Sequence, residues 1–214
     1  MRILSIDSSL GTQVAVVDTA ETAGLPVTCP VQVLSRAEQA DTRRHAESLG
    51  QMLSEALSAS GVADRPLDAV VAATGPAPFT GLRAGLVTAR VVGRTRGIPV
   101  HGVSSLDAVA RLALDEIGAR QGEKDPVVLV ATDARRREVY AALFRANGPD
   151  DVTRLTEISV CPPAQVAECI AVQAPEQGSG AAAIDTVAGS GAALYPELVG
   201  TASCHEVLAP VSGD

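Results

Sequence analysis

The sequence predicts an α/β protein made of two related halves, on three observations. Short apolar segments of strand length alternate with longer segments whose apolar residues recur at helical spacing. The segment 3–18 resembles the segment 129–144, since each has an apolar strand that ends in aspartate, a polar tip and a second apolar strand. The glycine turn at 72–76 likewise resembles the one at 187–191. A hairpin followed later by a glycine turn, found twice, indicates a duplicated α/β domain.

The composition fits this prediction and excludes several classes of function. A chain of 214 residues is long enough for one large domain or two small ones. Its net charge of −8 makes it a poor stand-alone nucleic-acid binder, because contacts of lysine and arginine with phosphates dominate nucleic-acid affinity. The first residues contain no apolar signal core, and no apolar run is long enough to span a bilayer. We therefore expect a cytoplasmic protein with reduced thiols and no membrane contact.

The first half should open with a hairpin. Its strands are the apolar segments 2–7 and 12–18, and Ser-Ser-Leu-Gly between them has the small and polar residues of a tight turn. A third strand is expected at 31–35, followed by a helix from about Asp41 to Gly61. The residues that recur on one face of this helix are His45, Leu49, Met52, Leu53, Ala56 and Leu57.

A glycine-rich segment, GPAPFTG at 75–81, lies between an expected strand at 68–74 and an expected helix at 82–96. This is the position of a phosphate-binding loop. The Walker A spacing is absent, however, and Leu82 stands where that motif needs lysine. The two prolines of the segment have no N–H group to donate to a phosphate. We therefore expect a stiff turn that sets the angle of the helix, with Thr80 as its N-cap.

Four small residues in the 82–96 helix leave two interpretations open. Glycine inside a helix costs about 1 kcal/mol relative to alanine, and close packing of another backbone offsets that cost. The small side chains would pack either on the protein's own sheet or against a helix of another chain. They are Ala84, Gly85, Ala89 and Gly93.

The second half should follow the same plan, and we divide the chain into residues 1–103 and 104–214. A strand at 97–103 leads into a helix that starts with the capping-box spacing of Ser104 and Asp107. The further elements expected are a hairpin at 125–144, a short helix from Pro162 and Pro163 to Ala171, a loop at 173–183, and a strand, glycine turn and helix at 185–200.

A second phosphate candidate is the strand-end segment Asp7, Ser8 and Ser9, which Asp133 matches in the second half. An aspartate at a strand end, followed by small hydroxyl residues, suits a metal-bound phosphate. Aspartate at a strand end is also a common turn former, so both interpretations stay open.

Other sites are weakly indicated or absent from the sequence. The three histidines are far apart, the segment that starts at His45 is not HExxH, and neither CxxC nor GxSxG occurs. We therefore expect no metal, no cofactor and no catalytic residue. Three arginines at the expected hairpin tip, 135–137, are either solvated or a secondary contact for RNA.

Four segments carry a resemblance to a known family: ILSIDSS at 3–9, GPAPFTGLRAGLVTARVVG at 75–93, GIPVHGVSSLDAVA at 97–110 and ATDARRREVYAALF at 131–144. They resemble the TsaB (YeaZ) family of tRNA threonylcarbamoyladenosine biosynthesis proteins, most specifically in FTGLR. The resemblance covers nearly the whole chain. It implies an α/β actin-like fold with two related halves, as in sugar kinases, actin and chaperone ATPases.

This chain departs from the family in two places. The family usually reads GPGSFTGLR, whereas Ala77 and Pro78 stand at the third and fourth positions here, which weakens a ligand role for the loop. Family members usually continue past the position of Asp214 with a last helix, so we expect a short or truncated member.

The resemblance also implies a function. A TsaB-type protein is a non-catalytic subunit that binds its paralogue TsaD. With the ATPase TsaE, they transfer a threonylcarbamoyl group from threonylcarbamoyl-adenylate to the adenosine beside the tRNA anticodon. The TsaB-type subunit contacts tRNA only through the complex. TsaD holds a metal with a histidine pair, whereas the corresponding helix region here has only His45.

The same resemblance implies which residues contact the partner. The family's heterodimer is built from two helices of the first half, which correspond here to about 41–58 and 82–96. The residues carried over as interface candidates are His45, Leu49, Met52, Arg83, Leu86 and Arg90. The same surface can form a homodimer when the partner is missing.

Two alternative functions compete with this one. Asp7, Ser8 and Ser9 together with the two glycine turns would suit a stand-alone actin-fold ATPase or small-molecule kinase, which would bind and turn over magnesium-ATP. A metallopeptidase is the other alternative, and it would need bound zinc or iron, for which the sequence shows no ligand cluster.

Overall fold

The fold is taken from a computed structural model that describes residues 1–19, 31–39, 45–61, 65–121, 125–173, 184–201 and 207–208. Contacts within the chain divide it into two compact units, Met1–Ser104 and Ser105–Asp214. Each unit has its own sheet, with one apolar core in the first unit and two in the second.

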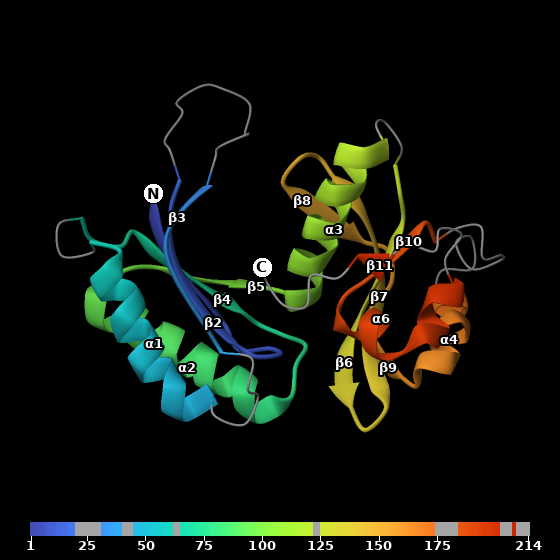
Figure 1. The fold of residues 1–214 in the computed structure, drawn as a ribbon, viewed down its shortest axis with the longest axis horizontal. Helices are drawn as coiled ribbons and strands as arrows, with labels where there is room; N and C mark the ends of the chain where they lie inside the picture. The colour runs from blue at the N-terminus through green and yellow to red at the C-terminus, as the bar shows by residue number, and fades with distance from the viewer. Residues whose placement is uncertain are drawn as a thin grey trace. The chain divides into compact units, whose positions relative to one another are not determined.

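The first unit is built around a five-stranded sheet with the strand order β3-β2-β1-β4-β5 (Figure 1). The strands are β1 (Arg2–Asp7), β2 (Thr12–Thr19), β3 (Val31–Gln39), β4 (Ala69–Ala73) and β5 (Val100–Val103). β2 is antiparallel to both β1 and β3, whereas β4 is parallel to both β1 and β5. Because side chains alternate between the faces of a strand, Leu4 and Ile6 of β1 both enter the core.

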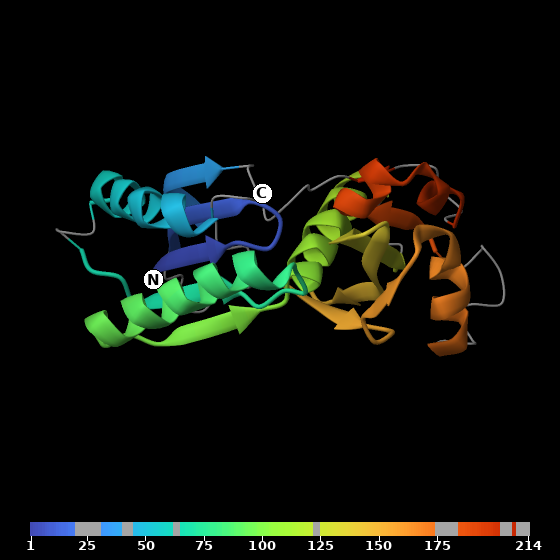
Figure 2. The same cartoon turned by 90° about the horizontal axis from the view of Figure 1, so that it is seen from below.

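Two helices, α1 (His45–Ala59) and α2 (Phe79–Arg96), lie side by side against this sheet (Figures 1 and 2). α1 packs against β2 and β3, whereas α2 packs against β1, β4 and β5, and the two helices contact each other. Helices and strands share one core, whose buried members are Leu4, Ile6, Val14, Val16, Leu49, Met52, Ala56, Leu67, Val70, Ala72, Ala89 and Val92.

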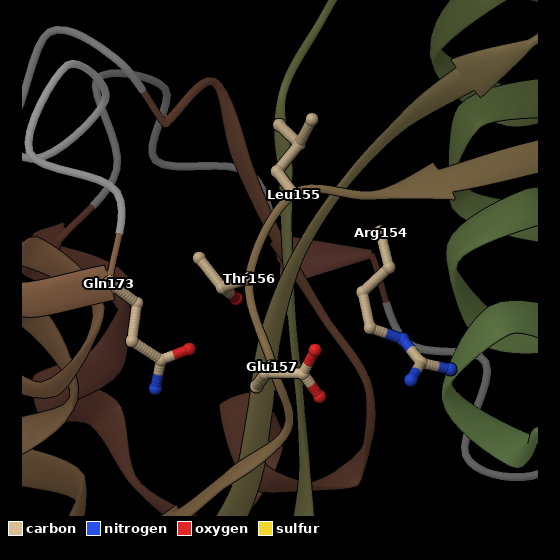
Figure 3. A pocket seen from close by; sticks show the side chains of 5 residues that line it. All are labelled: Arg154, Leu155, Thr156, Glu157 and Gln173. Atoms are coloured by element: carbon tan, nitrogen blue, oxygen red, sulfur yellow. The ribbon is translucent and has the colours of Figure 1, made fainter.

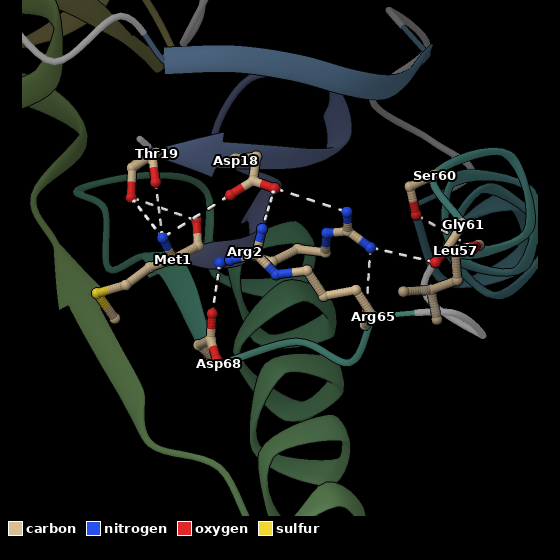
Figure 4. A network of polar contacts seen from close by, with 9 residues as sticks. All are labelled: Met1, Arg2, Asp18, Thr19, Leu57, Ser60, Gly61, Arg65 and Asp68. Carbon is tan, nitrogen blue, oxygen red and sulfur yellow. Dashed lines mark hydrogen bonds and ion pairs between the residues drawn. The ribbon is translucent and has the colours of Figure 1, made fainter. Parts of the chain in front are cut away.

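A network of polar contacts fixes the amino-terminal end of β1 (Figure 4). The carboxylate of Asp18 pairs with the guanidinium groups of Arg2, at 3.6 Å, and of Arg65, at 2.9 Å. The guanidinium of Arg2 also donates to the carbonyl of Gly61, just after α1, and its backbone N–H donates to Asp68. These contacts tie the first strand to its neighbour β2, to the end of α1 and to the segment before β4.

The second unit is built around a six-stranded sheet in which β11-β10-β6-β7-β8 follow one another and β9 also pairs with β7. The strands are β6 (Val128–Arg135), β7 (Glu138–Asn147), β8 (Asp151–Arg154), β9 (Ser159–Cys161), β10 (Thr186–Ala188) and β11 (Val207–Leu208). The helices are α3 (Ser105–Gln121), α4 (Val166–Gln173) and α6 (Ser190–Leu194), with short 3-10 helices η1 (Pro163–Gln165) and η3 (Pro196–Thr201).

The sheet of this unit separates two cores because β6 and β7 are buried on both faces. One core joins α3 to the face that carries Val128, Val130 and Phe144. The other joins α4, α6 and η3 to the face that carries Leu129 and Leu143.

The two sheets repeat one topology, which shows the two related halves expected from the sequence. From one edge to the centre, β3-β2-β1 and β8-β7-β6 are successive antiparallel pairs. From the centre to the other edge, β1-β4-β5 and β6-β10-β11 are successive parallel pairs. The fold is therefore the duplicated α/β fold of the actin-like class.

One predicted helix cap is at the wrong position, and the other is at the right position but lacks the expected side-chain bonds in the described part of the chain. α2 begins at Phe79 and the residue before it, Pro78, makes no side-chain capping bond, so Thr80 lies inside the first turn. The fixed backbone of proline starts the helix earlier than the sequence indicated. The hydroxyl of Ser104 has no hydrogen-bond partner among the described residues, and the carboxylate of Asp107 instead accepts a hydrogen bond from Arg154 on β8.

Several boundaries also differ from those expected. The third strand continues to Gln39, and β8 and β9 were not expected. Residue 173 ends α4, whereas the rest of the expected loop, 174–183, and the expected start of α1, at 41–44, lie outside the described residues.

Candidate partner interface

The strand-end segment Asp7, Ser8 and Ser9 is held by contacts within the protein. One carboxylate oxygen of Asp7 accepts hydrogen bonds from the backbone N–H of Ser9, at 2.7 Å, and from its hydroxyl, at 2.6 Å. The buried hydroxyl of Ser8 donates to the carbonyl of Gly81 at 2.9 Å. These contacts are those of a strand-end turn that is tied to α2, and a phosphate role for the segment stays a prediction.

Asp133 repeats this arrangement in the second half. Its carboxylate accepts a hydrogen bond from the backbone N–H of Arg135 at 3.0 Å and pairs with the guanidinium of the same residue at 3.2 Å. Its own N–H donates to the hydroxyl of Ser190, at the start of α6. In both halves, an aspartate at the end of the first strand therefore organises the turn that follows.

The small residues of α2 pack on the protein's own sheet. Gly85 lies against Ser8, so that a Cβ atom at this position would overlap the serine hydroxyl. Gly93 lies equally close to the side chain of Val100 on β5. Since these glycines and Ala89 are buried, the first of the two interpretations of the small-residue face holds, and any partner must contact the opposite face of α2.

That opposite face carries exposed apolar and basic side chains at helical spacing. Phe79, Val87 and Val91 are exposed to 66%, 59% and 55%. The exposed arginines of this face are Arg83, Arg90 and Arg94. We call these six residues the α2 stripe.

The charged residues of the α2 stripe are all positive. The helix contains four arginines and no acidic residue. Among the described residues, none of the three stripe arginines forms an ion pair, and the guanidinium of Arg83 instead lies 3.6 Å from the centre of the Phe79 ring. Stacking of this kind orders the guanidinium while leaving its N–H groups available to a partner. Arginine and aromatic residues are also the types enriched at the centres of protein interfaces.

The interface residues carried over from the family occupy different environments. Arg83 and Arg90 lie on the α2 stripe, whereas Leu86 is partly buried against the core. Leu49 and Met52 belong to the core, with exposures of only 2% and 7%, so the interface prediction rests on the two arginines. His45 begins α1, and its side chain lies outside the described residues.

The structure adds four stripe residues that the sequence reasoning did not name: Phe79, Val87, Val91 and Arg94. Phe79, Val87 and Arg94 lie three or four residues from Arg83 or Arg90, and Val91 lies four residues from Val87, so this spacing was visible in the sequence. The expected helix began after Phe79, which explains why that residue was missed. The other three lie within the expected helix, and the sequence does not say which of its faces meets the sheet.

A shallow pocket of about 530 Å³ in the second half is lined by Arg154, Leu155, Thr156, Glu157 and Gln173 (Figure 3). Three of its polar side chains already bind within the fold. Arg154 donates to Asp107, Thr156 accepts from the backbone of Leu143, and Gln173 donates to Ser159. We therefore do not take this pocket as the functional site.

The thiol of Cys161 on β9 is an inert group. The pKa of Cys161 is raised to about 12, mainly by burial and in addition by a hydrogen bond and charge interaction with Cys169 and by the charge of Glu138. A thiol that keeps its proton at neutral pH is a poor nucleophile and a poor metal ligand. In the described part of the chain, no three His, Cys, Asp or Glu side chains come together to hold a metal, and no helix is long and apolar enough to cross a membrane.

Comparison with known proteins shows which family the sequence matches. Residues 32–200 match the family described as TsaD, tRNA N6-adenosine threonylcarbamoyltransferase. A protein of Mycobacterium tuberculosis (strain ATCC 25618 / H37Rv), Rv3421c, is 42% identical over 143 residues, which cover 64% of this chain and 63% of the relative. The Escherichia coli (strain K12) tRNA threonylcarbamoyladenosine biosynthesis protein TsaB is 32% identical over 105 residues, which cover 49% of this chain and 43% of the relative.

Among solved structures, a Pseudomonas aeruginosa protein with similarity to peptidase YEAZ superposes with a TM-score of 0.67 at 25% identity. The superposition covers 97% of this chain and 82% of that one. In sequence, by contrast, the chain spans less than two thirds of the length of the mycobacterial relative.

Proposed function

The chain belongs to the TsaD family, with TsaB (YeaZ) proteins among its relatives, and we propose that it is a non-catalytic subunit that binds and activates a TsaD-type paralogue. The reaction it serves is threonylcarbamoylation of the adenosine beside the tRNA anticodon. The other components are a TsaE-type ATPase and tRNA, which this subunit meets only within the complex. It needs no cofactor of its own and acts in the cytoplasm.

The α2 stripe is the observation that carries the proposal. Three apolar side chains on one helix face are still more than half exposed, so burial by a partner would gain for each more than half of the about 1.5–3 kcal/mol that complete burial of such a side chain contributes. The unpaired arginines among them favour a partner surface with acidic groups around an apolar centre. A surface of this composition fits a protein partner better than a small-molecule substrate.

The alternative of a stand-alone ATPase or kinase has less support. Its best candidate site is the segment from Asp7 to Ser9, where the Ser8 hydroxyl donates to Gly81 and the Ser9 hydroxyl donates to Asp7. The neighbouring glycine turn carries two prolines, which cannot donate to phosphate oxygens. Turnover of magnesium-ATP by the isolated chain would move this alternative to first place.

A reconstituted modification assay tests the proposal. Threonylcarbamoyl-adenylate, unmodified tRNA, the TsaD-type paralogue and the ATPase would be supplied with and without this chain, and the modified nucleoside measured. Product that requires both the paralogue and this chain, with no activity from this chain alone, is the expected result. Equal product without this chain would show that the proposal is wrong.

A matched pair of substitutions tests the surface. Val87→Glu places a carboxylate in the centre of the α2 stripe and should weaken binding of the paralogue by about tenfold or more. Val172→Glu makes the same change on α4, where the valine is 80% exposed, and should leave binding unchanged. Calorimetric titration of the paralogue with each variant measures both, and equal effects of the two substitutions would exclude the α2 stripe as the interface.

A further inference from the structure

The turn between β6 and β7 has an unusual backbone for its sequence. Arg135, Arg136 and Arg137 all have positive φ, at 68°, 54° and 62°. Residues with a Cβ atom pay about 1–2 kcal/mol for this left-handed conformation, which glycine and asparagine adopt more readily. Three successive arginines therefore occupy positions whose backbone conformation favours glycine or asparagine.

The strand register explains why the turn needs positive φ. Asp133 lies opposite Val139 and Arg135 lies opposite Glu138, so Arg136 and Arg137 form a two-residue hairpin loop. Two-residue loops of the kind that matches strand twist have positive φ at both central positions, typically with the sequence Asn-Gly. The shift in register between Asp133 and Arg135 adds a bulge, where glycine is again the usual residue.

The base of the turn is fixed, and its tip presents free charge. The Asp133 carboxylate holds both the backbone and the side chain of Arg135. Arg136 and Arg137 are exposed, and neither forms an ion pair with another described residue. Glu138, which follows the tip, is partly buried, and within the described part of the chain it forms no ion pair with either tip arginine. The turn projects from the end of its sheet in Figure 1.

Folding does not account for arginine at the tip. Arg136 and Arg137 contribute no ion pair within the described residues, and both occupy a disfavoured backbone conformation. Both side chains are exposed, and a guanidinium group can make bidentate contacts with phosphate oxygens. The turn itself contains only charged residues, unlike the α2 stripe, which has the apolar centre of a protein interface.

We propose that the Arg136–Arg137 tip binds the phosphate backbone of RNA. The inference rests on the proposed function in one respect, namely that the RNA is the tRNA substrate held in the complex with the paralogue. The tip contributes electrostatic affinity and orientation, and it reads no sequence because phosphate contacts carry none. It thereby gives this subunit a direct contact with the substrate, in addition to its role in binding the paralogue.

The test uses three variants of the turn and a charge-matched control. Arg136→Ala with Arg137→Ala removes the charge, Arg136→Lys with Arg137→Lys keeps it, and Arg136→Asn with Arg137→Gly removes it while giving the turn its favoured sequence. The control, Arg36→Ala with Arg145→Ala, removes the same charge at two arginines that pair with Glu38 and Asp125 on the surface.

Affinity for an unmodified tRNA transcript would be measured by fluorescence anisotropy, for the complex with the paralogue and for this chain alone. The two charge-removing variants should weaken binding by roughly three- to tenfold and reduce the slope of log K against log salt by about 2, between about 50 mM and about 200 mM salt. The lysine variant and the charge-matched control should retain the slope of the unsubstituted protein. Because Asn-Gly is the favoured sequence of this turn, the Asn-Gly variant removes the charge without destabilising the hairpin.

Three outcomes would overturn the inference. An equal loss with the control would show a general effect of net charge, and an unchanged salt slope in both charge-removing variants would show that the tip does not touch phosphate. Loss of paralogue binding with unchanged tRNA affinity would assign the tip to an acidic protein surface. If the unsubstituted chain fails to bind the paralogue, the proposed function fails. The chain alone at about 50 mM salt, where electrostatic binding is strongest, then decides the inference about the tip: no tRNA binding, or binding that the charge-removing variants leave unchanged, would overturn it.

Discussion

At the scale of single residues, the structure shows that polar side chains at strand ends serve the fold. Asp7 and Asp133 each accept the backbone N–H two residues later, which makes them equivalent turn formers in the two halves. This equivalence was predictable from the aligned sequence segments. The bond from the Ser8 hydroxyl to Gly81 was not, because it joins residues 73 positions apart and depends on how α2 packs.

Cys161 gives a prediction about pH. Its pKa is raised from 9.0 to about 12 in the folded protein, first by burial, so the folded state favours the neutral thiol. Above about pH 9 the unfolded chain loses this proton while the folded chain keeps it, and stability therefore falls as the pH rises toward about 12. Urea unfolding of the protein between these pH values should show this fall.

Other groups also titrate at high pH, so comparison with Cys161→Ala is needed to isolate the contribution of this thiol to the pH dependence of stability. The variant should lose the part of the pH dependence that is due to this thiol. A pH dependence identical to that of the unsubstituted protein would contradict the assignment. Iodoacetamide labelling at pH 8, followed by peptide mapping, should in addition modify Cys161 only after unfolding.

At the scale of elements, long segments with a clear period were predictable and short ones were not. The helices α1, α2 and α3 and the hairpin β6–β7 follow from their apolar spacing. β8 and β9 have four and three residues with no apolar alternation, so their pairing with β7 is set by the tertiary fold. The α2 stripe was only half predictable, because sequence spacing shows that two faces exist but does not say which one meets the sheet.

The packing of α2 gives the prediction at this scale. Gly85→Ala would place a methyl group against Ser8 and disturb its bond to Gly81, which should lower the free energy of unfolding by about 1–3 kcal/mol. Gly50→Ala is the matched change on α1, where nothing lies within 4 Å of an added Cβ atom. It should raise the free energy of unfolding by about 0.5–1 kcal/mol, since alanine favours a helix. Urea titration of both variants would contradict this account if they changed stability in the same direction.

At the scale of the whole molecule, two copies of one α/β unit have acquired different surfaces. The first half displays the α2 stripe, whereas the second displays the arginine tip at the hairpin that corresponds to the segment from Asp7 to Ser9. The duplication was predictable, because its signature is local sequence. The exposed arginine tip was also predictable, because it lies at an expected hairpin turn. The α2 stripe was not fully predictable, because it depends on which face of the helix packs on the sheet.

The α2 stripe also determines how the chain should associate with itself. In a symmetric dimer through this surface, the apolar residues would meet one another, but the arginines of the two copies would also be brought together. Because salt screens that repulsion, self-association should strengthen as the salt concentration rises. Binding of an acidic surface on the paralogue should weaken over the same range, since salt screens attraction equally.

Sedimentation velocity of the isolated chain at increasing salt measures the first effect, and the same experiment with the paralogue measures the second. Val87→Glu should remove self-association, because it introduces a carboxylate at the apolar centre of both copies, whereas Val172→Glu should not. A homodimer that weakens with salt, or that survives Val87→Glu, would place self-association on another surface. If the two assemblies have these opposite salt dependences, the paralogue should displace the second copy most readily at low ionic strength.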